Sequence, residues 1–321
     1  MSAGPVDGRV VVVGAGTIGS LFAAHLASET EVWVLARRPE HAAALEADGL
    51  TVTGKSMLHA RLRATSEPDG LPEFSLAIVA TKANELAGAV ARLAGHSPGA
   101  VVMTCQNGLG ADEIVSHVGP WPLLASVTFM SGTRHGDTEV EYELDAPTWL
   151  GPSDLRPPAP GVAAGVAALL RRGGLRAEAF DDVRPAMWSK LIFNATVNSL
   201  SALTRLPHDG HFGAERDITD LGHLARQLVE EGRAVAEEAG IALHEDPWEM
   251  NLEAIRRGES AKGRYRHLPS MLEDVLAGRA TEVDFITGAL VREGLARAVP
   301  VPLHLAMWRL MRALEDSYRP A

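Results

Sequence analysis

Short, uniformly hydrophobic runs alternate with helix-like stretches through the first half of the chain. The β-branched runs lie at residues 10–13, 31–35, 76–79 and 101–104, and helix-like stretches between and after them lie at 18–28, 40–47 and 83–93. Consecutive hydrophobic residues without alternation suit strands that are buried on both faces of a parallel sheet. The order of these runs therefore predicts βαβ units and an α/β fold of the Rossmann type.

The pattern changes after residue 123. Residues 139–144 alternate as in a hairpin, a proline-rich turn follows at 157–160, and a helix at 162–170 with a strand at 175–179 completes the predicted first domain, residues 1–180. From there on strand signals fade, and an all-α second domain, residues 181–321, is predicted. Its expected amphipathic helices are 185–203, 217–239, 268–277, 283–298 and 302–316.

Composition supports a two-domain protein of ordinary globular character. A chain of 321 residues is long for one core, and its 46% hydrophobic and 22% charged residues are typical of globular domains. No stretch approaches the ~20 apolar residues of a membrane span, and residues 1–8 lack the basic start of a secretory signal. The single cysteine, Cys105, fits a reducing compartment, so a cytoplasmic protein without membrane partners is expected.

The formal net charge of −11 argues against nucleic-acid binding, which requires basic patches. Metal chemistry has no support either, because the twelve histidines are scattered and none forms an HExxH motif. Residues 208–211, the nearest approach to a cluster, are interpreted as a turn between helices. A homodimer stays open, since apolar helices such as 303–314 could pack within a domain or across two copies.

A glycine-rich turn directly follows the first predicted strand. Gly14 permits a tight turn, Gly16 lets the backbone approach a pyrophosphate, and Gly19 allows close helix–strand packing. Thr17 and Ile18 open the following helix, whose N-terminus faces the negative charge. This context predicts a dinucleotide site, against the alternative of a glycine-rich turn that binds no nucleotide.

The end of the second predicted strand carries arginine where NAD enzymes usually carry an acidic residue. Arg37, followed by Arg38, can grip a 2′-phosphate with charge-assisted hydrogen bonds and stack on adenine. The sequence thus favours NADP(H) as the cofactor, with Arg37 as the main contact. The alternative is an exposed surface arginine pair at a strand end.

Three polar residues share one face of the predicted helix 185–203. Lys190, Asn194 and Asn198 are spaced by four, so they form a stripe in an otherwise apolar helix. Asparagine is a poor helix former, and an unpartnered buried polar stripe would cost stability. The stripe therefore indicates a functional groove, with an exposed polar face as the alternative.

Four blocks in a fixed order resemble the ketopantoate reductase (2-dehydropantoate 2-reductase) family over nearly the whole chain. The blocks are the glycine turn with Arg37; 80–83 and 106–108; 188–191 with Asn194 and Asn198; and 269–271 with 281–284. The resemblance implies a helical C-terminal domain like that of 6-phosphogluconate dehydrogenase. It also implies an NADPH-dependent oxidoreductase of pantothenate biosynthesis, on the way to coenzyme A. This enzyme would reduce the 2-oxo acid 2-dehydropantoate to pantoate in the crevice between its domains.

The resemblance assigns the catalytic roles to two residues. Lys190 would be the general acid, stabilising and then protonating the oxygen of the substrate carbonyl as hydride reaches its carbon. Glu282 would bind the substrate hydroxyl or orient the lysine. Taken alone, a glutamate on a helix is usually a solvated surface residue.

The remaining assignments concern binding. Ser270, Asn194 and Asn198 would hold the substrate, and Asn107 would lie beside both the nicotinamide and the lysine. Lys82 would lie near the cofactor ribose or the nicotinamide; without the resemblance it is an ordinary loop charge.

Two positions depart from the family pattern near the substrate. Thr287-Gly288 stands where members often have Asn-Gly, and His267 stands where an asparagine is expected three residues before Ser270. These departures keep two alternatives open. One is a reductase of another 2-oxo acid, carbonyl or imine on the same scaffold, and the other is a non-catalytic NADP(H) sensor.

Overall fold

The computed structural model describes residues 8–213, 219–260 and 268–318. Two compact units divide the chain: residues 1–106 with 111–183, and residues 107–110 with 184–321. The predicted division between 180 and 181 lies a few residues before the main crossing point. The short segment 107–110, which carries Asn107, groups with the second unit although it follows a strand of the first.

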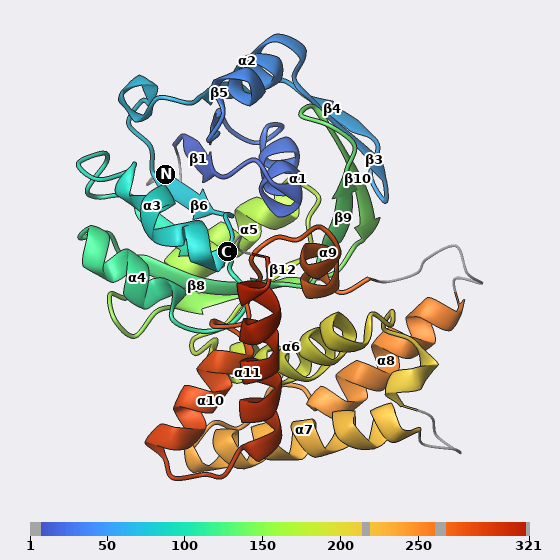
Figure 1. Cartoon of the computed structure of the whole chain (residues 1–321). Helices are drawn as coiled ribbons and strands as arrows, with labels where there is room; N and C mark the ends of the chain where they lie inside the picture. The colour runs from blue at the N-terminus through green and yellow to red at the C-terminus, as the bar shows by residue number, and fades with distance from the viewer. Residues whose placement is uncertain (1–7, 214–218, 261–267, 319–321) are drawn as a thin grey trace. The chain divides into compact units, whose positions relative to one another are not determined.

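An eight-stranded sheet forms the centre of the first unit (Figure 1). Its order is β12-β11-β8-β7-β6-β1-β2-β5, with all neighbours parallel except β11 against β8. The strands are β1 (Val10–Val13), β2 (Val32–Leu35), β5 (Arg63–Thr65), β6 (Leu76–Val79), β7 (Val101–Thr104), β8 (Leu123–Thr128), β11 (Thr148–Pro152) and β12 (Ala177–Ala179). Every residue of β1, β6 and β7 is buried, as expected for strands covered on both faces.

Helices cover both faces of this sheet and give each strand two buried sides. Helices α1 (Thr17–Leu26), α2 (Pro39–Asp48) and α5 (Val162–Arg172) belong to one hydrophobic core with Val10 and Val12. Helices α3 (Leu86–Ala91) and α4 (Ala111–Val118) belong to the other, with the alternate residues Val11 and Val13. The predicted Rossmann-type domain is therefore present.

A second sheet of four strands, order β4-β3-β10-β9, lies beside α1 (Figure 1). Its strands are β3 (Leu50–Gly54), β4 (Leu58–Ala60), β9 (Ser131–Arg134) and β10 (Glu139–Leu144). The predicted hairpin near 139–144 corresponds to the antiparallel pair β9–β10. Strand β9 lies close to the start of α1. A Cβ atom on Gly132 would lie 3.2 Å from Thr17 Cγ2.

The second unit is helical, and α6 (Arg184–Thr204) packs against each of its other five α-helices (Figure 1). These are α7 (Asp220–Glu238), α8 (Pro247–Ser260), α9 (Ser270–Leu276), α10 (Thr287–Ala296) and α11 (Pro302–Asp316). Fifteen of the 21 residues of α6 are buried, which matches a helix that is surrounded by others. The all-α second domain is confirmed by these described elements.

Two details of the helical unit differ from the sequence prediction. Helix α8 was not predicted, although Asp246 caps it by accepting from the backbone N–H groups of Trp248 and Glu249. An aspartate before Pro247 is a recognisable helix start, but the apolar positions of α8 are sparse. The predicted helix 283–298 begins only at Thr287, because residues 282–286 form a turn.

Candidate active site

The glycine turn in the first unit has the backbone that close phosphate binding requires. Gly14 has φ +96°, and a Cβ atom on Gly19 would lie 1.9 Å from Gly14 O. No atom lies within 4 Å of the Cβ position of Gly16, the N-cap residue of α1, so this side of the turn is open. The first amides of a helix have no partner within it, and Thr17 and Ile18 supply two of them. These residues fit a dinucleotide pyrophosphate.

Arg37 and Lys82 follow the carboxyl ends of β2 and β6, the two strands that flank β1 in the sheet. Arg37 follows β2, and its guanidinium forms an ion pair of 2.6 Å with Glu85 Oε1. The Arg37 side chain is 77% exposed, so the guanidinium stays accessible to a ligand. Lys82 follows β6 and is the N-cap residue of the short 3-10 helix at Ala83–Glu85.

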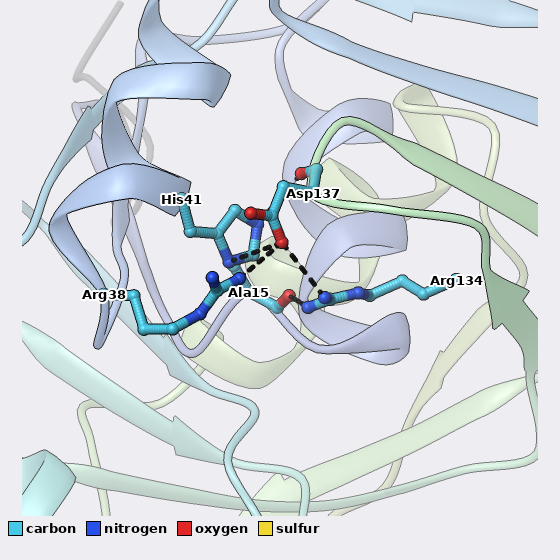
Figure 2. A network of polar contacts seen from close by, with 5 residues as sticks. All are labelled: Ala15, Arg38, His41, Arg134 and Asp137. Atoms are coloured by element: carbon cyan, nitrogen blue, oxygen red, sulfur yellow. Dashed lines mark hydrogen bonds and ion pairs between the residues drawn. The ribbon is translucent and has the colours of Figure 1, made fainter.

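Arg134 is a further basic residue beside the glycine turn, and no sequence motif indicated it. Its Nη1 donates to the carbonyl oxygen of Ala15 at 2.7 Å, and its Nη2 lies 3.3 Å from Asp137 Oδ1 (Figure 2). Ala15 and Arg134 are 119 residues apart, so no local spacing could reveal the contact. Pairing of β9 with β10 places Arg134 there.

The predicted stripe on α6 is present in the second unit, and it is buried. Lys190, Asn194 and Asn198 are 8%, 7% and 6% exposed. The alternative of an exposed polar face is therefore wrong. Lys190 Nζ donates to Asn107 Oδ1 at 2.9 Å, and Asn194 Nδ2 lies 3.5 Å from the same oxygen.

Asn107 joins the stripe to Glu282. Its Nδ2 group lies 3.4 Å from Glu282 Oε2, so one amide side chain contacts the lysine, an asparagine and the carboxylate. The contact to Glu282 is long for a hydrogen bond, whereas the 2.9 Å contact between Lys190 and Asn107 has an ordinary length. The four residues combine a proton donor, two amides and an acid in one partly buried group.

Backbone contacts fix the two turns that carry Asn107 and Glu282. Leu109 N donates to Phe285 O at 3.0 Å, and Phe285 N and Ile286 N both donate to Glu282 O. Gly108 has φ +95°, and a Cβ atom there would lie 1.9 Å from Phe285 O. Only glycine permits this approach of the two turns. Glu282 therefore lies at the start of a turn, and the predicted helix that should follow it directly at 283 begins only at Thr287.

The other substrate-binding candidates have different surroundings. Ser270 is exposed at the first position of α9, and the neighbouring Met271 packs in the core that includes α6. Thr287 is fully buried, and its hydroxyl lies 2.7 Å from Ser199 Oγ on α6. His267, the other departure from the family pattern, lies outside the described residues.

Two family models match consecutive parts of the chain. The model for ketopantoate reductase PanE/ApbA matches residues 10–154, and the model for the C-terminal part of ketopantoate reductase PanE/ApbA matches residues 182–315. The chain is also 30% identical to a 2-dehydropantoate 2-reductase of Pyrobaculum aerophilum, over 74% of this chain and 76% of the relative. The chain belongs to the ketopantoate reductase family. It is an oxidoreductase of the group that acts on CH–OH.

Other ketopantoate reductases match along almost their full length. The 2-dehydropantoate 2-reductase of Archaeoglobus fulgidus is 29% identical over 96% of this chain and 98% of its own. The crystal structure of a PanE/ApbA family ketopantoate reductase from Ralstonia eutropha JMP134 is 28% identical, with a TM-score of 0.81 over 97% and 99% of the two chains. A D-mandelate dehydrogenase solved with NADH and anilino(oxo)acetate shares the fold, at 24% identity and a TM-score of 0.82 over 97% and 99%.

None of the described helices combines the length and apolar character needed to cross a bilayer. Within the same residues, no group of three or more histidine, cysteine, aspartate or glutamate side chains is arranged to hold a metal ion.

Proposed function

We propose that this protein reduces 2-dehydropantoate to pantoate with NADPH, and that Lys190 is the general acid. The observation that carries the proposal is the buried contact of Lys190 Nζ with Asn107 Oδ1 at 2.9 Å, beside Asn194 and Glu282. The relatives named 2-dehydropantoate 2-reductase, which match along 96% of the chain, support the choice of substrate.

The chemistry of Lys190 follows from the charge that develops on the substrate. Reduction of a carbonyl carbon leaves negative charge on its oxygen, and an ammonium group beside that oxygen stabilises the charge and then transfers a proton. The product is the hydroxyl, and the amine regains its proton from solvent. Low exposure of Lys190, at 8%, strengthens the electrostatic effect because water screens it less.

Asn107 and Glu282 orient the acid in this proposal. The amide oxygen of Asn107 accepts from Lys190 and limits the directions in which the ammonium group can point. Glu282 lies next to the Asn107 amide nitrogen and provides an acceptor for a substrate hydroxyl. Asn194, Asn198 and Ser270 are the proposed hydrogen-bonding partners of the substrate carboxylate and hydroxyl groups.

The nicotinamide dinucleotide, when bound, would supply the hydride for the carbonyl carbon. The residues that would hold it are the glycine turn with Thr17 and Ile18, together with Arg37, Lys82 and Asn107. A guanidinium at the end of β2, where an acid would repel a 2′-phosphate, supports NADPH over NADH.

A second candidate is the reduction of a different 2-oxo acid by the same chemistry. The observation that favours it is Thr287, which differs from the family pattern and forms a hydrogen bond with Ser199 in the interior. A change at a position that packs against α6 can alter the packing beside Asn198 without touching Lys190.

A spectrophotometric screen distinguishes the two candidates. Loss of reduced cofactor is followed with NADPH and then NADH, against 2-dehydropantoate and a panel of other 2-oxo acids. The proposal expects the highest kcat/KM for 2-dehydropantoate with NADPH. A higher value for another 2-oxo acid would select the second candidate, and absence of turnover with every compound would favour the non-catalytic sensor.

A further inference from the structure

A small charged cluster in the first unit lies beside the glycine turn and has no part in the function proposed so far (Figure 2). Asp137 is at its centre, in the turn between β9 and β10. Its Oδ1 atom lies 2.5 Å from Arg38 Nη2 and 3.3 Å from Arg134 Nη2. His41 on α2 donates from Nε2 to the Asp137 backbone carbonyl oxygen at 2.9 Å.

Two contacts fix this cluster to the glycine turn. Arg134 Nη1 donates to Ala15 O at 2.7 Å, between the two glycines that shape the turn. Gly132 of the same strand lies against Thr17, where a Cβ atom would approach Thr17 Cγ2 to 3.2 Å. These contacts hold the Arg134 guanidinium beside the glycine turn, and Asp137 joins the Arg38 guanidinium to it.

The cluster has a surplus of positive charge. Burial lowers the pKa of His41, and although Asp137 opposes this effect the net direction is downward, so His41 is neutral at pH 7. Two arginines then face one carboxylate. The side chains of Arg38 and Arg134 are 49% and 32% exposed, so an anion in solution can reach both guanidinium groups.

The ion pairs of Asp137 with Arg38 and Arg134 contribute little to the stability of the fold. Ion pairs between partly exposed side chains contribute about 0–1 kcal/mol each. By contrast, a guanidinium fixed beside a phosphate-binding turn can form paired hydrogen bonds with a phosphate group.

We propose that Arg38, held with Arg134 by Asp137, recognises the 2′-phosphate of the adenosine ribose and so contributes to the choice of NADP(H) over NAD(H). The inference rests on the proposed function insofar as the site takes a nicotinamide dinucleotide. Arg38 directly follows Arg37, and the two guanidinium groups contact different carboxylates, Asp137 and Glu85. A phosphate with two negative charges thus meets arginines on two sides, and Asp137 weakens its binding by repulsion.

Calorimetric titration with adenosine 2′,5′-bisphosphate and with 5′-AMP tests this without any turnover. Arg38→Ala should lower the affinity for the bisphosphate about tenfold or more and leave the affinity for 5′-AMP within about twofold. Asp137→Asn keeps an oxygen that can accept from both arginines and removes one negative charge, so it should raise the affinity for the bisphosphate. Arg172→Ala is the matched control, because Arg172 pairs with Glu29 on the same unit, away from the turn.

Retained binding of 5′-AMP shows that each variant is folded around the glycine turn. The inference is overturned if Arg38→Ala reduces bisphosphate affinity no more than Arg172→Ala does, or if Asp137→Asn fails to raise it. Its failure differs from failure of the proposed function. If only the inference about Arg38 fails, the wild type still prefers the bisphosphate and reduces 2-dehydropantoate. If the proposed function fails, the wild type binds the bisphosphate but does not reduce 2-dehydropantoate.

Discussion

Lys190 presents an ammonium group that is almost completely removed from water. Burying a charged side chain costs free energy unless polar partners compensate for the lost hydration. Buried positions on a helix are therefore normally apolar. The contact with Asn107 offsets part of this cost, and Glu282 lies on the other side of the same amide. A costly arrangement of this kind is typical of a site where the charge has a chemical task.

Replacement of Asn107 by alanine tests whether the acid must be oriented. Asn107→Ala removes the acceptor at 2.9 Å from Lys190 and the donor to Glu282. Since the ammonium group would lose its direction, kcat should fall by about 10- to 100-fold while the protein stays folded. Steady-state kinetics with circular dichroism as the folding control measures both, and an unchanged kcat would contradict the orienting role.

Local spacing in the sequence was enough to find part of this site. The interval of four residues placed Lys190, Asn194 and Asn198 on one face of a helix, and the structure has them there. Asn107 and Glu282 are 175 residues apart and came only from the resemblance to a family. Contacts made by distant turns leave no periodic signal in the chain.

At the scale of elements, the two turns at 107–110 and 282–286 bring these distant residues together. Gly108→Ala should push them apart, because its Cβ atom would lie 1.9 Å from Phe285 O and its φ of +95° disfavours other residues. We expect a loss of kcat at least as large as that predicted for Asn107→Ala, and a lower melting temperature. Gly99→Ala is the control, since nothing lies within 4 Å of its Cβ position. Equal effects of the two substitutions would contradict this account.

The start of α11 depends on a buried pair with a pH signature. Glu231 on α7 accepts from the backbone amides of Leu303 and His304 and contacts His304 Nδ1 at 2.9 Å. Burial lowers the pKa of His304, and its contact with Glu231 only partly opposes this. Burial also raises the pKa of Glu231, but hydrogen bonds from His304 and the two amides outweigh it and lower the pKa.

Both shifts make the helical unit less stable in acid. A histidine whose pKa is lowered in the folded state loses stability as pH falls from its ordinary value of 6.5 toward the folded value. A glutamate with a lowered pKa adds a further loss below its ordinary value of 4.5. The melting temperature should therefore fall between pH 7 and 5, and His304→Gln should flatten part of that slope. Parallel slopes for wild type and variant would refute the assignment.

Element prediction succeeded where burial imposes a clear pattern. The strands β1, β6 and β7 are buried on both faces, and their uninterrupted hydrophobic runs marked them with the observed bounds. Helix α8 was missed, because its polar sequence gives a weak apolar stripe and its start depends on the Asp246 cap. The pairing of β3 with β10 joins segments almost ninety residues apart, which the alternation within each strand does not encode.

The net charge of the protein, −11, contrasts with the anions that the proposed function requires it to bind. Local arginines and helix amides must therefore supply the attraction, and we propose this role for Arg37, Arg38 and Arg134. The acidic surroundings weaken nonspecific binding of polyanions and leave these few groups to select the ligand.

Growth of a bacterial strain that lacks its own 2-dehydropantoate 2-reductase tests the activity in a living cell. Expression of the wild-type chain should restore growth without pantothenate, because the proposed reaction yields pantoate. Growth is compared with that of a strain that expresses the Lys55→Ala variant as a control. Lys55 is exposed on the first unit, so its replacement should leave growth unchanged. Failure of the wild type to restore growth, despite soluble expression, would count against 2-dehydropantoate as the substrate.

The kcat of Lys190→Ala with NADPH and 2-dehydropantoate, compared with that of Lys55→Ala, tests whether Lys190 is the general acid. Loss of a positioned general acid typically lowers the rate by about 10²- to 10⁴-fold, and we expect Lys190→Ala to fall in this range while Lys55→Ala keeps the wild-type rate. A Lys190→Ala enzyme within about twofold of the wild type, too small a change for loss of a general acid, would contradict the account.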